Sequence, residues 1–99
     1  MADVTQEMIM AWKEKGPVFK CSVGDLDIYY RPLSRATYFE IMQETASNSG
    51  TDPELTTVMK CILNEVSEKT LTERGGIATV VYEQIMLKSG FVNVASEEV

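Results

Sequence analysis

Apolar and polar side chains alternate over residues 19–30, and only Gly24 and Asp25 interrupt the pattern. If these two residues form a two-residue loop, the flanking segments pair as the strands of a β-hairpin. The predicted register gives an apolar face of Val23 with Leu26, Cys21 with Ile28 and Phe19 with Tyr30, and an opposite face of Ser22 with Asp27 and Lys20 with Tyr29. Glycine at the first loop position favours a type II′ turn. Because a lone hairpin is marginal in water, we expect its apolar face to lie on helices.

Before the hairpin, residues 4–14 have the spacing of a short amphipathic helix, which Gly16 and Pro17 end. Its apolar positions are Val4, Met8, Ala11 and Trp12. Two interpretations remain open. This face packs on the rest of the protein, or the N-terminal segment presents an adaptable surface to a partner, since methionine side chains repack easily. The residues of that surface would be Met1, Met8, Ile9, Met10 and Trp12.

After the hairpin, Pro32 ends the second strand, and Ser34 is a natural N-cap for a helix that reaches about Ala46. The apolar positions expected to form its buried stripe are Tyr38, Phe39, Ile41, Met42 and Ala46. Asp52 is the predicted cap of the next helix, with Pro53 at its first position. Helical spacing then continues through Leu55, Val58, Met59, Ile62, Leu63 and Val66.

The polar segment 67–76 is predicted to be a loop, and residues 77–89 a final helix. Gly90 suits the left-handed position after that helix, and Phe91 suits the hydrophobic contact that accompanies it. The predicted fold is therefore α+β and mostly helical: an N-terminal helix, one two-stranded antiparallel β-hairpin, then three helices. The predicted division is an N-terminal amphipathic helix over 1–15, a single α+β domain over 17–91 and a flexible acidic tail over 92–99. Whether the N-terminal helix docks or is mobile is left open.

Composition narrows the classes of function. The 99 residues suffice for one modest core, and 44% hydrophobic with 24% charged residues is ordinary for a globular protein. A net charge of −6 argues against nucleic acid as the main partner. The chain has no apolar run near the ~20 residues of a membrane span. Its first residues do not resemble a signal peptide, so we expect a cytosolic protein.

Residues suited to catalysis or metal binding are scarce. The chain has no histidine, so a Ser-His-Asp or Cys-His arrangement and the usual structural zinc sites are excluded. Cys21 and Cys61 are expected to be buried, reduced thiols. Asp25 and Asp27 lack the further oxygen ligands of a calcium loop. We therefore expect no enzyme, and no catalytic, cofactor-binding or metal-binding residues.

Arg31 and Arg35 flank Pro32, Leu33 and Ser34 in an elbow between the hairpin and the next helix. Two guanidinium groups placed this way suit the binding of a partner's carboxylate. The alternative is internal pairing with an acid such as Asp27 or Glu40, or exposure to water. The candidate partner-binding residues are Arg31, Leu33, Arg35, Met8, Ile9 and Trp12.

The chain resembles the small tail-assembly chaperones of long-tailed bacteriophages in three segments, which occur in the same order over residues 18–91. The first is the elbow Tyr30-Arg31-Pro32-Leu33-Ser34-Arg35 after the hairpin. The second is Cys61-Ile62-Leu63 in a middle helix, and the third is the final helix that opens with Gly76-Ile77 and closes with Ser89-Gly90-Phe91. Two features depart from the family: no proline follows the Cys-Ile-Leu run, and the methionine-rich N-terminal helix has no counterpart.

The resemblance implies a non-enzymatic assembly factor in the cytoplasm of the infected host. Its partner would be the tape-measure protein or tail subunits. Apart from the resemblance, a homo-oligomer is left open, and we expect no nucleic acid, membrane or cofactor. The departures leave open a structural baseplate or connector component of the virion. A small metal-free enzyme and a host-directed regulator are the remaining alternatives.

Overall fold

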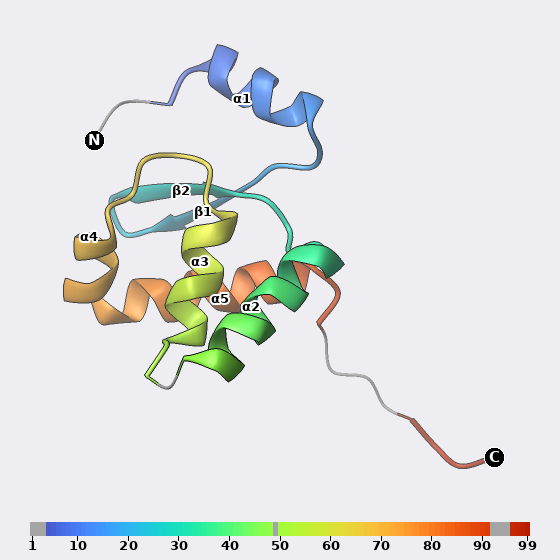
Figure 1. Ribbon diagram of the computed structural model, residues 1–99. Helices are drawn as coiled ribbons and strands as arrows, with labels where there is room; N and C mark the ends of the chain where they lie inside the picture. Colours follow the sequence, from blue (N-terminus) through green and yellow to red (C-terminus); the bar gives the residue numbers. More distant parts are fainter. Residues whose placement is uncertain (1–3, 49, 92–95) are drawn as a thin grey trace.

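The computed structural model describes residues 4–48, 50–91 and 96–99, which form five helices and one two-stranded sheet (Figure 1). In chain order these elements are α1 (Gln6–Glu14), β1 (Phe19–Val23), β2 (Leu26–Tyr30), α2 (Arg35–Ser47), α3 (Pro53–Cys61), α4 (Glu68–Glu73) and α5 (Gly75–Lys88). The mostly helical α+β fold, with its N-terminal helix and single hairpin, is confirmed. Residues 92–95 of the predicted tail lie outside the described residues, as does Met1, and residues 96–99 are exposed and without regular structure.

The hairpin has the predicted register, with Phe19 opposite Tyr30, Cys21 opposite Ile28 and Val23 opposite Leu26. Gly24 has a φ of +63°, and no described residue other than glycine has a positive φ. A positive φ at the first loop position alone is the pattern of a type II′ turn. The alternation of side chains along the chain therefore determined both faces of the sheet.

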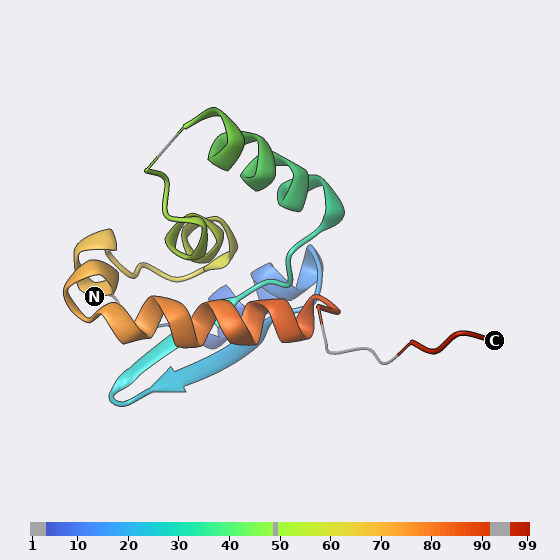
Figure 2. The same ribbon diagram turned by 90° about the horizontal axis from the view of Figure 1, so that it is seen from below.

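The hairpin lies between two layers. α1 lies on one side of the hairpin and the other helices lie on the opposite side, with α3 between α2 and α5 (Figures 1 and 2). The contact of Trp12 with Tyr29 places α1 on the polar face, and the core residues Leu26, Ile28 and Tyr30 place the other helices on the apolar face. Side chains from both strands and from all helices except α1 meet in one hydrophobic core. Its buried members are Leu26, Ile28, Tyr30, Leu33, Ile41, Val58, Cys61, Val66, Leu71, Ile77, Val81 and Ile85.

The middle helix is shorter than predicted. Helical spacing extends to Val66, but α3 ends at Cys61. The following residues run along the outer edge of β2, where the Arg31 N–H donates to the Cys61 carbonyl at 3.0 Å and the Leu63 N–H donates to the Tyr29 carbonyl at 2.8 Å. These bonds satisfy backbone groups of β2 and of the residue that follows it, so tertiary pairing overrides local helical periodicity.

The segment 67–76 is not simply a loop, because it contains α4. Ser67 caps this helix by accepting the Thr70 N–H at 3.1 Å, and Leu71 anchors it in the core. A six-residue helix with one core residue has no apolar periodicity, so the prediction missed it. The available signal was Ser67 as an N-cap followed by Glu68 in the first turn.

The other helix ends agree with the sequence. Ser34 and Asp52 are N-caps, and their side chains accept backbone N–H groups of the first turn. Gly90 has a φ of +94°, and the Phe91 N–H donates to the Met86 carbonyl at 2.9 Å, which closes the C-terminal end of α5.

The predicted buried stripe of α2 is correct for Ile41 and in part for Tyr38, which packs against the core, and it is wrong for Phe39, Met42 and Ala46. Ile41 is its one buried residue, whereas Phe39 is 49% and Met42 is 47% exposed. The helix packs against α3, and its apolar residues divide between the core and the surface. This division defines the surface considered next.

Candidate functional site

The elbow between the hairpin and α2 is a junction of several elements. Its backbone bonds to the end of α3 through Arg31, and the Leu33 N–H donates to the Ser89 hydroxyl of α5 at 2.7 Å. Leu33, predicted as a partner contact, is only 8% exposed and belongs to the core. That prediction is therefore corrected: Leu33 holds the elbow in place, and a partner cannot reach much of its side chain.

Arg31 is directed toward α1. Its Nη2 donates to the Trp12 carbonyl at 3.1 Å, at the C-terminal turn of that helix. A cation suits this place, because the carbonyl end of a helix carries partial negative charge. Within the described residues, neither Asp27 nor Glu40 forms an ion pair with Arg31. The internal partner of Arg31 is therefore a backbone carbonyl and not one of the two acids named above.

The N-terminal helix is docked on the polar face of the hairpin by a small set of contacts. The rings of Trp12 and Tyr29 lie 5.7 Å apart at 44°. Met8, Ile9 and Trp12, three of the predicted partner residues, are half-buried, and no residue of α1 is fully buried. A shallow groove of about 350 Å³ remains between α1 and the hairpin, with Ile9 and Tyr29 in its lining. The helix therefore covers this face without joining the core.

Arg35 lies elsewhere, on α2. Its guanidinium carbon is 4.7 Å from the centre of the Phe39 ring and 5.4 Å from that of Tyr38. Arg31 and Arg35 thus have different neighbours, and the structure does not bring them together as a clamp for one carboxylate. Arg35 is instead the charged end of an aromatic cluster.

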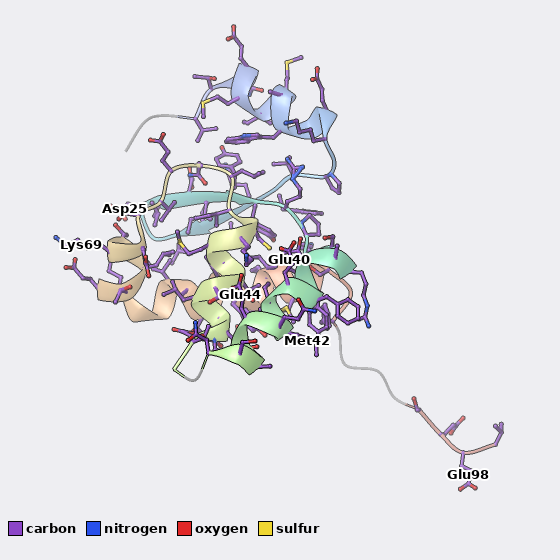
Figure 3. All side chains as sticks on the ribbon, in the orientation of Figure 1. Asp25, Glu40, Met42, Glu44, Lys69 and Glu98 are labelled. Atoms are coloured by element: carbon purple, nitrogen blue, oxygen red, sulfur yellow. The ribbon has the colours of Figure 1, made fainter. Side chains whose placement is uncertain are left out.

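We define the α2 patch as Arg35, Tyr38, Phe39 and Met42. Arg35, Phe39 and Met42 are four and three residues apart, so they follow one side of the helix. Tyr38 is half-buried at the edge of the patch, where its ring lies 5.2 Å from that of Phe91. Met42 is labelled in Figure 3 among exposed side chains of α2. The sequence signal that was missed is Arg35 one turn before Phe39, which marks that side of the helix as facing solvent.

Acids line the other side of α2. Glu44 pairs with Lys60 of α3 at 3.1 Å, while Glu40 and Gln43 share a shallow depression with it. Figure 3 shows Glu40, Met42 and Glu44 on this one helix. The patch is therefore an apolar surface with a cation at its N-terminal end and acids beside it.

The thiols are not activated. Burial raises the pKa of Cys61 to about 11 and also raises the pKa of Cys21, so both favour the uncharged form. Neither forms a disulfide in the structure. Within the described residues, no three of the cysteine, aspartate and glutamate side chains gather as a metal site would require.

The two aspartates at the hairpin turn have structural contacts. Asp25 pairs with Arg74 at 3.6 Å, and Asp27 accepts the Ser22 hydroxyl at 2.7 Å. Both residues are exposed. The interpretation of these residues as a turn with a solvated face agrees with these contacts.

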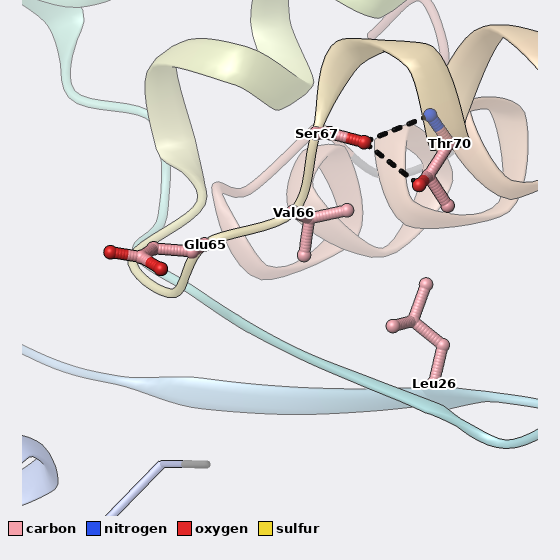
Figure 4. Close-up of a pocket in the computed structure, with 5 residues that line it drawn as sticks. All are labelled: Leu26, Glu65, Val66, Ser67 and Thr70. Carbon is pink, nitrogen blue, oxygen red and sulfur yellow. Dashed lines mark hydrogen bonds between the residues drawn. The ribbon is translucent and has the colours of Figure 1, made fainter. Parts of the chain in front are cut away.

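A depression of about 390 Å³ lies between the hairpin and α4 (Figure 4). Its lining consists of Leu26, Glu65, Val66, Ser67 and Thr70. The Ser67 and Thr70 hydroxyls lie 2.8 Å apart, and Ser67 also caps α4. The Ser67 and Thr70 side chains of this pocket therefore stabilise the first turn of α4. The Glu65 carboxylate, which is exposed, has no such role.

Comparison of the chain with protein-family models, with curated proteins and with solved structures found no match. In the described ranges, no helix combines the length and the apolar character needed to cross a membrane.

Proposed function

We propose that this protein is a non-enzymatic tail-assembly chaperone of a long-tailed bacteriophage, which binds the tape-measure protein or tail subunits during assembly. The observation that carries the proposal is the α2 patch, where aromatic and methionine side chains remain exposed beside a cation. The family resemblance of the elbow and final helix supplies the identity of the partner.

The chemistry of the patch favours an apolar helical segment of the client that carries an acidic residue. Phe39 and Met42 offer apolar area, and methionine adapts to clients of different shape. Arg35 supplies a cation already oriented by the Phe39 ring, which suits a carboxylate on the client. The overall charge of −6 favours solubility of the complex.

Coexpression with the tape-measure protein from the same phage tests the proposal. We expect the client to become soluble and to copurify with this chain. The substitution Met42→Ala should reduce copurification, and Met59→Ala is the matched control, because Met59 is also exposed but lies on α3. An insoluble client with no complex would refute the proposal.

A structural role in the virion is separated by a second measurement. A chaperone is absent from mature particles or present in trace amounts, whereas a baseplate or connector component has a fixed copy number. Mass spectrometry of purified particles therefore distinguishes these functions, and a stoichiometric amount of this chain would favour the structural component.

A further inference from the structure

The two edges of the hairpin differ. In the observed register, Tyr29 on β2 directs its N–H and C=O groups outward, where Asn64 and Leu63 bind them. On β1, Lys20 and Ser22 direct the same groups away from β2. No group within the described residues hydrogen-bonds to these outward backbone groups. Figure 2 shows β1 as the outer strand, with no described element beyond it.

Side-chain burial shows the same asymmetry. Leu26, Ile28 and Tyr30 of β2 are buried, but their cross-strand partners Phe19, Cys21 and Val23 on β1 are only half-buried. Other side chains therefore cover the apolar face of the hairpin only in part along β1. An additional strand beside β1 would cover the half-buried side chains of β1 and satisfy the open backbone groups.

We infer that β1 is a self-association edge, and that two copies of this chain pair their β1 strands antiparallel about a two-fold axis, which continues the sheet from one copy into the other. This inference is independent of the proposed function. A second copy is favoured as the occupant because the edge is complementary to itself when the two-fold axis passes through Cys21.

That register is centred on Cys21. It pairs all five residues of β1, with Phe19 opposite Val23 of the second copy and Lys20 opposite Ser22 of the second copy. In each pair of Lys20 with Ser22 of the other copy, the backbone N–H of each residue then donates to the carbonyl of the other. Moving the axis to Lys20 would place two lysines directly opposite each other, which is unfavourable, and would leave one end of each strand unpaired.

Charge complementarity supports the same arrangement. Asp27 lies beside Ser22 in each copy and accepts its hydroxyl at 2.7 Å. Lys20, placed opposite Ser22 of the second copy, therefore comes near Asp27 of that copy, and the two-fold axis repeats the pair. On the apolar face, the half-buried Phe19 and Val23 side chains cover each other across the junction.

Cys21 provides a chemical readout. In this register the two Cys21 residues face each other in a non-hydrogen-bonded pair, where Cα atoms are about 4.5 Å apart. This spacing is within the range that a disulfide spans. Diamide, which accepts the two electrons and two protons released by a pair of thiols, should therefore crosslink the dimer through Cys21.

The experiment measures mass by light scattering across a dilution series of the purified chain, with and without diamide. We expect a dimer at high concentration, and a diamide crosslink that persists in Cys61→Ala and disappears in Cys21→Ala. A chain that stays monomeric up to its solubility limit, or a crosslink that depends on Cys61 instead, would overturn the inference.

Variants of the edge give an independent measurement. Ser22→Pro removes an outward N–H without removing a bond to β2, so dimer formation should be lost, whereas the control Ser22→Ala keeps that N–H and the dimer. Lys20→Glu should weaken dimerisation about tenfold, and Lys20→Glu combined with Asp27→Lys should restore it. Circular dichroism establishes that each variant is folded. Unchanged dimerisation in folded Ser22→Pro and in Lys20→Glu would contradict edge pairing.

Discussion

The side-chain amide of Asn64 completes the outer edge of β2 at Tyr29. Its Oδ1 accepts the Tyr29 N–H at 2.9 Å, and its Nδ2 donates to the Asp27 carbonyl at 2.9 Å. Asn64 is 8% exposed, so water is largely excluded from these bonds. The Asn64 side chain thereby makes the two hydrogen bonds that the backbone of a neighbouring strand would make at this edge. Asn64 lies shortly after the end of α3 at Cys61.

Replacement of Asn64 by alanine should therefore destabilise the protein. The change leaves a part-buried N–H and a carbonyl without their partner, which costs about 1–3 kcal/mol. The free energy of unfolding in urea measures the loss. Asn48→Ala is the matched control, because Asn48 is exposed and its recorded bonds use the backbone carbonyl. Equal effects of both substitutions would contradict the role of Asn64.

Ile85 and Leu87 of α5 allow the effect of a buried side chain on stability to be compared with that of an exposed one. Ile85→Ala removes a fully buried side chain and should lower the free energy of unfolding by about 2–5 kcal/mol. Leu87→Ala removes a side chain that is 49% exposed and should change stability by about 0.5 kcal/mol or less. Thermal or urea unfolding checks both variants, and a similar loss for Leu87→Ala would mean that its surface is covered in solution.

Arg31→Ala should release α1 from the hairpin without unfolding the domain, because the lost bond joins the guanidinium to the Trp12 carbonyl. The chain has one tryptophan, so its fluorescence reports on this helix directly. We expect emission at longer wavelength and faster amide exchange in α1. Arg74→Ala, which removes only the exposed pair with Asp25, is the control and should leave the emission unchanged. Global loss of helicity in Arg31→Ala would show instead that Arg31 supports the whole fold.

The stability should fall in alkaline solution because of Cys61. Its pKa is near 9 as an ordinary thiol and about 11 in the folded protein, so above pH 9 the unfolded chain loses this proton first. The contribution is fully present below pH 9 and is lost as the pH rises toward 11. Urea unfolding at several pH values tests this, and Cys61→Ala should be less sensitive over the same range. An identical pH dependence in both proteins would exclude this cause.

Much of the fold was predictable because local chemistry agrees with the final structure. Alternation with a Gly24-Asp25 loop set the hairpin register, and serine, aspartate and glycine marked the ends of helices. The candidate site was less predictable. Arg35, a predicted partner residue, is exposed, but Leu33 is buried, and Phe39 and Met42 are exposed despite their helical spacing.

The sequence by itself determined which side chains share a face of the hairpin and where most helices begin, since these depend on residues a few positions apart. Only the tertiary structure decided that the chain leaves α3 at Cys61, because the reason lies in β2, about thirty residues earlier, whose open edge requires hydrogen-bond partners. It also decided which apolar residues of α2 reach the core. Helical periodicity places a residue on a side of a helix, but the neighbouring helix determines whether that side is covered.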